Sequence, residues 1–160
     1  MKAVVQRCSW ARVHCRTEDG EDCTADAGPG MLILLGVMKG DSELEARKLA
    51  ARIARFRFFA DEAGKMNLSA LDLGREVVVV SQFTLAADGR SGRRPSFDRA
   101  APPATAEPLY ELFVAELRQL GLETSCGRFG ASMRVELEND GPVTFALEES
   151  PSEGRPGNPL

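Results

Sequence analysis

The sequence lacks most of the groups that conventional catalytic and metal sites use. Its one histidine, His14, has no acidic or cysteine residues grouped around it. The four cysteines follow no CxxC or zinc-ligand spacing, so we expect free thiols packed as small apolar side chains. These absences disfavour a metal site or a nucleophile activated by a side-chain base, and nothing in the sequence requires a cofactor.

Long apolar segments are also missing. No apolar run approaches the roughly 20 residues that a membrane-spanning helix needs. The first seven residues form no apolar signal segment. We therefore expect a cytoplasmic protein with no membrane partner.

Charge is distributed unevenly over a mildly acidic chain of net charge −4. Residues 46–60 hold five basic side chains and no acidic one, and a second basic cluster lies in residues 90–99. An acidic protein with local basic patches fits a discrete phosphate contact better than a groove that coats nucleic acid. The alternative is that both clusters are simply solvated faces.

The pattern of the first third predicts strands. Residues 2–15 show stretches of alternation, and residues 18–21 form a turn signal that predicts a hairpin into a short strand at 22–27. The continuous apolar run 31–37 has the length of a buried strand. A capping box, Ser42 with Glu45, then begins a helix.

Later residues add strands and a second helix. A buried strand opens at 77–80, residues 86–103 resemble a loop, and an apolar stripe predicts a helix over 106–120. Two last strands are expected at 131–138 and 142–148. The predicted fold is α+β, with a strongly curved, barrel-like sheet and two main helices packed outside it. One domain, residues 1–148, precedes a Pro/Gly-rich tail, 149–160, which we expect to be disordered.

Polar residues follow the valine run of the strand that opens at 77, in the order Ser81, Gln82, Phe83 and Thr84. In a regular strand Ser81 and Phe83 share one face while Gln82 and Thr84 share the other. All four therefore line one pocket only if the strand bends or ends there. One interpretation is a strand end whose hydroxyls satisfy nearby backbone groups. The other is a pocket with Phe83 as its apolar wall and backbone N–H groups directed at a substrate carbonyl oxygen.

Two glycine-containing segments are further candidates. Asn139-Asp140-Gly141-Pro142 reads locally as an Asp-Gly hairpin turn, but a cis Gly141-Pro142 bond would make a rigid tip. In Gly127-Arg128-Phe129-Gly130 the glycines permit close approach of a ligand, and the Phe129 ring could stack on a base. Alternatively, this segment is a turn whose phenylalanine belongs to the core.

Seven stretches in this order resemble the D-aminoacyl-tRNA deacylase family, over residues 1 to about 148. They are Ala3-Val4-Val5-Gln6-Arg7, Leu34-Leu35-Gly36-Val37, Gly64-Lys65-Met66-Asn67-Leu68-Ser69, Val80-Ser81-Gln82-Phe83-Thr84-Leu85, Gly92-Arg93-Arg94-Pro95-Ser96-Phe97, Gly127-Arg128-Phe129-Gly130-Ala131 and Asn139-Asp140-Gly141-Pro142-Val143-Thr144. The resemblance implies a homodimer of small β-barrel-like subunits. It also implies hydrolysis of the ester that joins a D-amino acid, or glycine, to the terminal adenosine of tRNA.

The resemblance also implies roles for individual residues. The segment Ser81-Gln82-Phe83-Thr84 would form the catalytic pocket that holds the amino group and the adenosine. Three residues would cradle the adenine: Phe129, Gly130 and Met133. A cis Gly141-Pro142 would enter the partner subunit's site and exclude L-amino acids, and Arg7 would help to fix that turn. A sister group that handles L-alanine has a different strand motif and a trans Gly-Pro.

Three questions stay open from sequence. A nucleic-acid-binding module without catalysis is the main alternative, and a metallohydrolase is a third possibility. Thr84 as a covalent nucleophile is a minority hypothesis, because no base is apparent near it.

For the tRNA backbone, we expect phosphate contacts from Arg52, Arg55, Arg93 and Arg94.

Overall fold

The computed structural model describes residues 1–18, 20–90 and 93–151 of the chain. In this part of the chain the main sheet has six strands, ordered β2-β1-β3-β6-β7 with β8 also pairing to β1. Their bounds are β1 (Lys2–Thr17), β2 (Gly20–Ala27), β3 (Gly30–Gly36), β6 (Glu76–Ser81), β7 (Thr124–Cys126) and β8 (Met133–Glu148).

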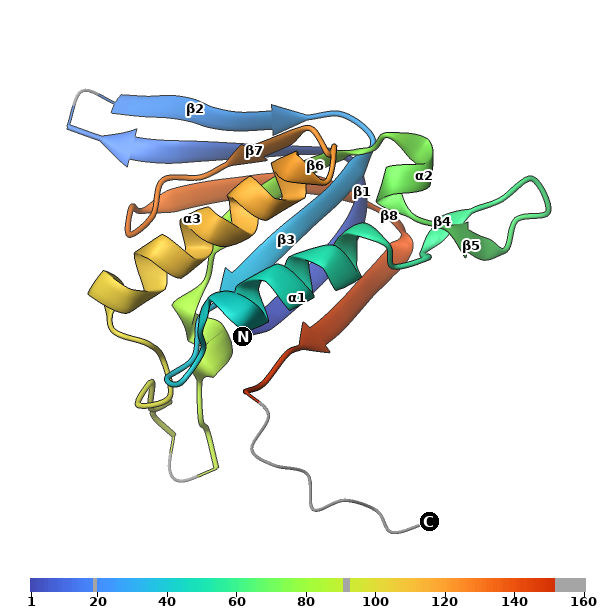
Figure 1. Ribbon diagram of the computed structural model, residues 1–160. Coiled ribbons are helices and arrows are strands. Elements are labelled where there is room, and N and C mark those ends of the chain that lie inside the picture. Colours follow the sequence, from blue (N-terminus) through green and yellow to red (C-terminus); the bar gives the residue numbers. More distant parts are fainter. Residues whose placement is uncertain (19, 91–92, 152–160) are drawn as a thin grey trace, which may run out of the picture.

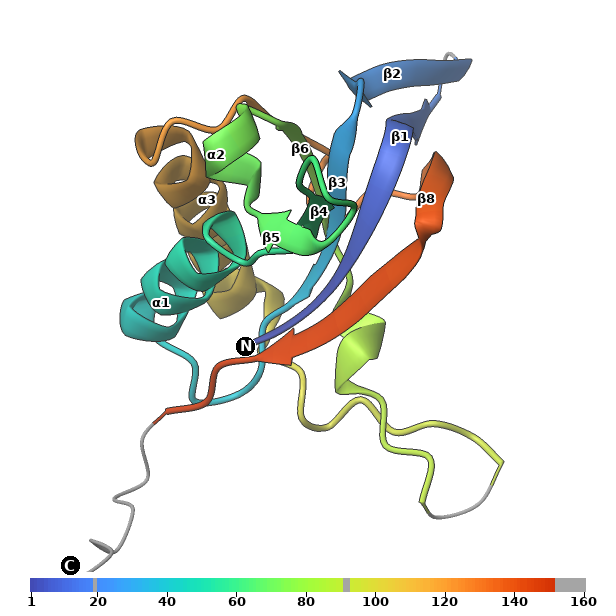
Figure 2. The ribbon, with the colours of Figure 1, turned by 90° about the vertical axis from the view of Figure 1, so that its right-hand side faces the viewer.

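Two long helices, α1 (Glu43–Ala54) and α3 (Pro103–Gln119), pack together over one face of this sheet (Figures 1 and 2). The shorter elements are β4 (Phe59–Ala60), β5 (Met66–Leu68), α2 (Ala70–Leu73) and the 3₁₀-helix η1 (Phe83–Ala86). A curved sheet with two main helices outside it confirms the predicted fold class. Among the described residues, no helix combines the length and apolarity that crossing a bilayer requires.

The curvature of the sheet comes from β1, which is shared between several partners. Its first half pairs with β3, its second half pairs with β2, and β8 runs antiparallel along its other side. The register shifts twice against β8, around Cys8, and once against β2, after Val13. Such bulges bend a strand and increase its twist, so the sheet curls around its own long strands.

Alternation along the strands divides the sheet into two faces. Val5, Ile33 and Val79 point toward the helices and are fully buried against side chains such as Leu49 and Phe113. Neighbouring positions on the strands point to the opposite face, as the two-residue period requires. The helix-facing side therefore contains the main core.

Both helices begin where local chemistry favours a start. Ser42 and Glu45 form the predicted capping box of α1. Helix α3 begins at Pro103, earlier than the predicted residue 106, because proline suits the first helical turn, where its missing N–H is not needed. The stripe of apolar residues alone did not reveal this extra turn.

The prediction of two final strands joined by an Asp-Gly hairpin was wrong. Residues on both sides of Gly141 belong to the single strand β8, and both sides pair with β1. The partners jump from Gln6–Thr144 to Cys8–Asn139, so the intervening residues loop out of the ladder. The chain does not reverse, because β1 offers β8 a template before and after this loop.

The amino terminus forms a buried ion pair. The Met1 ammonium group lies 2.6 Å from Asp41 Oδ1, and both side chains are almost completely buried. Asp41 Oδ2 also accepts a hydrogen bond from Met38 N, so the carboxylate joins β1 to the loop before α1. Glu149, assigned to the tail from sequence, donates its N–H to Met1 O at 2.9 Å. The rest of the predicted tail, from residue 152, lies outside the described residues.

Replacing Asp41 by asparagine should lower the free energy of unfolding by about 3 kcal/mol, because a buried charge would lose its partner. Urea unfolding measures this change. The matched control is Asp26→Asn, which breaks the Arg12–Asp26 pair, whose side chains are both more than half exposed. The control should cost less than about 1 kcal/mol. Equal losses would contradict a special role for the buried pair.

Candidate active site

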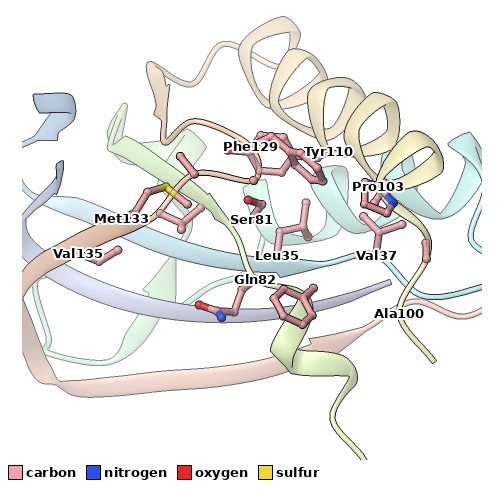
Figure 3. A pocket seen from close by; sticks show the side chains of 16 residues that line it. Leu35, Val37, Ser81, Gln82, Ala100, Pro103, Tyr110, Phe129, Met133 and Val135 are labelled. Carbon is pink, nitrogen blue, oxygen red and sulfur yellow. The ribbon is translucent and has the colours of Figure 1, made fainter. Parts of the chain in front are cut away.

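The main cavity opens where the parallel strands β3 and β6 end. Both strands run in the same direction, so their carboxyl ends meet at one edge of the sheet. The cavity there has a volume of about 580 Å³, within the usual range for small-molecule sites. Its wall combines residues from the sheet, from the start of α3 and from the chain between β7 and β8: Leu35, Val37, Val80, Ser81, Gln82, Phe83, Ala100, Ala101, Pro103, Ala106, Tyr110, Phe129, Gly130, Ala131, Met133 and Val135 (Figure 3).

The segment after β6 reaches this cavity because the strand ends at Ser81. Gln82 N donates to Leu35 O at 2.7 Å, and the chain then turns into η1. Ser81, Gln82 and Phe83 consequently line the same cavity, although a regular strand would place them on alternate faces. The strand end thus brings three residues of this segment to one cavity.

Thr84 lies apart from the other three residues of its motif. It is exposed and is not part of the cavity wall. Its hydroxyl accepts a hydrogen bond from Gln82 Nε2. The geometry thus gives Thr84 a contact with a pocket residue but no place on the wall itself.

Phe83 offers an aromatic surface at the mouth of the cavity. Its side chain is 59% exposed, which is unusual for a phenylalanine. The ring meets Phe97 edge to face, with centroids 5.0 Å apart. An exposed ring held at a fixed angle by a second ring suits stacking on a planar ligand.

The opposite wall comes from the chain that follows β7. Phe129, Gly130 and Met133 all line the cavity, as a ligand-cradling role requires. Gly130 has φ +71°, which lets the chain turn directly after the Phe129 ring. Figure 3 shows Phe129 beside Tyr110 of α3, with ring centroids 5.8 Å apart.

Sequence reasoning missed the contribution of α3. Pro103, Ala106 and Tyr110 follow one another at helical spacing and face the cavity. Their sequence pattern indicates only a buried helix face, because periodicity does not distinguish a packed core from a cavity wall. The tyrosine was the one usable signal, since its hydroxyl needs a polar partner when it is buried.

The described cavity wall carries no charged or imidazole side chain. His14 lies in β1, with its Nε2 atom 3.9 Å from Glu136 Oε2. The described residues also contain no group of three His, Cys, Asp or Glu side chains able to hold a metal ion. The groups available for chemistry in the wall are therefore hydroxyls, an amide and the backbone.

None of the described cysteines lines the cavity wall either. Cys8, Cys15 and Cys126 are free thiols. Burial raises the pKa of the Cys8 thiol to about 11. At neutral pH that thiol stays protonated and unreactive, so Cys8 acts as an apolar side chain of β1.

Gly141 and Pro142 are not among the residues of the cavity wall and lie on the loop between Asn139 and Thr144, within β8. Their peptide bond is cis, as the resemblance implies, and both residues are exposed. Arg7 holds the preceding residue: its Nε atom donates to Asp140 O at 3.0 Å and lies 3.2 Å from Asp140 Oδ2. The same guanidinium donates to Phe58 O at 2.8 Å, which anchors it to the body of the protein.

Asn139 closes the base of this loop. Its Oδ1 atom accepts from Val143 N at 2.8 Å, and its Nδ2 atom donates to Thr144 Oγ1 at 3.1 Å. Arg7 and Asn139 thus hold the loop at separate points. An exposed loop with this many internal bonds is rigid enough to present its backbone in one orientation.

Gly141→Ala should destabilise the loop. Gly141 has φ +136°, and an added Cβ would lie 2.6 Å from Val143 Cγ2. We expect a loss of about 1–3 kcal/mol in unfolding free energy, because L residues rarely adopt this conformation. Gly89→Ala is the control, since nothing lies within 4 Å of its added Cβ. Denaturant unfolding that gives the same result for both variants would argue against this steric constraint.

Comparison with known proteins supplies a family. Residues 4–148 match the family model described as D-Tyr-tRNA(Tyr) deacylase. A D-aminoacyl-tRNA deacylase of Roseiflexus sp. (strain RS-1) is 57% identical over 150 residues, which cover 94% of each chain. One of Ruegeria pomeroyi is 55% identical over 148 residues, covering 92% of this chain and 99% of the relative.

A solved structure agrees in fold and in sequence. The c-Myc DNA Unwinding Element Binding Protein superposes with a TM-score of 0.85 at 38% identity, covering 94% of this chain and all of that one. The chain belongs to the D-aminoacyl-tRNA deacylase family.

Proposed function

We propose that this chain hydrolyses the ester between a D-amino acid, or glycine, and the terminal adenosine of tRNA. Relatives named D-aminoacyl-tRNA deacylase at 55–57% identity support the reaction. The observation that carries the proposal is the cavity at the end of β6, where Ser81, Gln82 and Phe83 face Phe129 across an uncharged space. The reaction belongs in the cytosol, where charged tRNA is used.

An aminoacyl ester suits a site without a strong base. The ester is already activated, so catalysis requires mainly positioning of the terminal ribose hydroxyl or a water next to the carbonyl. The Phe83 amide, in the cavity wall at the start of η1, precedes the first intrahelical hydrogen bond and would serve as an oxyanion donor. One such donor contributes about 10²–10³ in rate.

The sheet face opposite the helices supports the proposal of a homodimer. Ala146, Val4, Leu34 and Val80 lie side by side across four strands. Ala146 is exposed on the edge strand β8, and Val4 and Leu34 are half-buried although β1 and β3 lie inside the sheet. A second copy packed on this face would bury them. Sedimentation as a 17.3 kDa particle at assay concentration would contradict the dimer.

The dimer would bring Gly141-Pro142 to the partner subunit's cavity. The loop is exposed and held by Arg7, so its carbonyl groups could oppose a side chain of the wrong hand. A clash of about 4 kcal/mol would give roughly thousandfold discrimination. Glycine has no side chain to clash, so its acceptance follows from the same geometry. Selectivity would then come from rejection of L-amino acids.

The decisive assay compares release of amino acid from D-Tyr-tRNA, L-Tyr-tRNA and Gly-tRNA by purified protein. We expect cleavage of the D-tyrosyl and glycyl esters, with the L-tyrosyl ester cleaved at least about a thousandfold more slowly. Equal rates for both hands would refute the gate. Binding of tRNA without any cleavage would favour a non-catalytic nucleic-acid-binding module, and loss of activity in a chelator would favour a metallohydrolase.

A Thr84→Val arm of the same assay separates main-chain catalysis from covalent catalysis. Thr84 is exposed and outside the cavity wall, so the variant should keep appreciable activity. Complete loss of cleavage with retained tRNA binding would instead make the hydroxyl the nucleophile.

The four arginines proposed to contact phosphates occupy two places. Arg52 and Arg55 lie at the end of α1, which Figure 1 places beside α2 and β4, away from η1. Arg52 already donates to Glu148 O at 3.1 Å. Arg93 and Arg94 are exposed in the segment between η1 and α3. This segment follows η1 directly in the chain, and η1 carries Phe83 at the mouth of the cavity. The latter two are therefore the stronger candidates for the acceptor end.

Charge reversal at Arg93 and Arg94 should weaken tRNA binding and flatten its dependence on salt. Each lost phosphate contact should reduce the slope of log K against log salt by about 0.7–0.9. Arg55→Glu serves as the comparison, and fluorescence anisotropy at several salt concentrations provides the measurement. Unchanged slopes for all variants would mean that both clusters are only solvated faces.

A further inference from the structure

The hydroxyl of Tyr110 ties helix α3 to the strand that ends in the active site. Tyr110 is 3% exposed, and its Oη atom donates to Val79 O at 2.9 Å. Val79 lies two residues before Ser81 in β6, so both face the same side of the sheet. This bond therefore fixes where the cavity-lining face of α3 sits relative to the end of β6.

The same carbonyl oxygen also holds the opposite wall. Gly127 N donates to Val79 O at 3.0 Å, at the point where the chain leaves β7. From there it runs directly into the segment that carries Phe129 and Gly130. Val79 O is thus a shared acceptor for α3 and for the start of the Phe129 segment.

The Tyr110 ring supports that wall as well. Its centroid lies 5.8 Å from that of Phe129, with a tilt of 50° between the planes. Figure 3 shows the two rings side by side above Ser81 and Leu35. Phe129 is only half-buried, so Tyr110 is the fixed surface against which its ring rests.

We propose that Tyr110 is a positioning residue for the nucleoside-binding wall: its hydroxyl and ring together set the distance between Phe129 and the Ser81–Phe83 strand end. Through one side chain, Tyr110 joins α3 to β6 by a hydrogen bond and to the Phe129 segment by a ring contact. The inference deepens the proposed function, since the ligand of this wall is taken to be the terminal adenosine.

A role in the chemical step is not consistent with this geometry. The hydroxyl proton is engaged by Val79 O, inside the protein. Burial also raises the pKa of Tyr110 well above its usual value, so the group stays neutral at physiological pH. Tyr110 therefore acts through the shape of the site and exchanges no proton with substrate.

Tyr110→Phe tests the proposal with little risk to folding. The ring is kept, and Val79 O retains its bond from Gly127 N, so no buried acceptor is left alone. Loosening of the wall should weaken substrate binding equally in the ground and transition states. We expect KM for D-Tyr-tRNA to rise about fivefold, which corresponds to about 1 kcal/mol of binding free energy lost to the looser wall. The turnover number and the preference for the D-ester should stay unchanged.

A matched control separates positioning from general stability. Val114→Ala removes buried volume from the same helix, at a residue that does not line the cavity. It should lower the melting temperature at least as much as Tyr110→Phe and leave KM unchanged. Titration with adenosine 5′-monophosphate, followed by isothermal calorimetry in wild type and both variants, measures nucleoside binding without the reaction.

The possible outcomes are distinguishable. A raised KM and weaker nucleotide binding in Tyr110→Phe, but not in Val114→Ala, support the proposal. Unchanged KM and nucleotide binding overturn it, and so does a fall in turnover number at constant KM, which would place Tyr110 in the chemical step. If wild-type protein cleaves no D-aminoacyl-tRNA, the proposed function fails, and the nucleotide titration still decides whether Tyr110 shapes the cavity.

Discussion

The parallel pairing of β3 with β6 is the constraint on which the site depends. It brings two carboxyl ends to one edge of the sheet, and the bond from Gln82 N to Leu35 O is the last step of that ladder. After this bond the chain turns into η1. The cavity lies beyond the strand end, where a continuation of β6 would otherwise run. Helix α3 and the segment after β7 then close this space from two sides.

The exposed Gly141-Pro142 loop depends on the same long strand in a different way. Because β1 pairs with β8 on both sides of the loop, the loop leaves a continuous ladder at a fixed place. Arg7, itself in β1, holds it from the side of the sheet. One strand therefore positions both the sheet beneath the cavity and the loop proposed to serve the partner subunit.

Sequence reasoning succeeded where a local pattern has one physical meaning. The capping box at Ser42 and the apolar run 31–37 each predicted an element that the structure contains. It failed at Asn139–Gly141, because the same residues suit a hairpin and an outward loop, and only the distant partner β1 decides between them. The four-residue motif at Ser81 was recognised as a site, but its geometry depends on where the ladder with β3 stops. Pro103 and Tyr110 were missed as wall residues, since helical periodicity reports burial and is silent about cavities.

The absence of charge from the described cavity wall has a consequence for the environment in which the protein works. A chamber lined by hydroxyl, amide, aromatic and aliphatic groups offers no ion to neutralise and no proton to gain or lose at ordinary cellular acidity. Changes in pH or salt would act on this cavity only through groups outside its wall. The composition of the wall therefore keeps its charge constant near neutral pH.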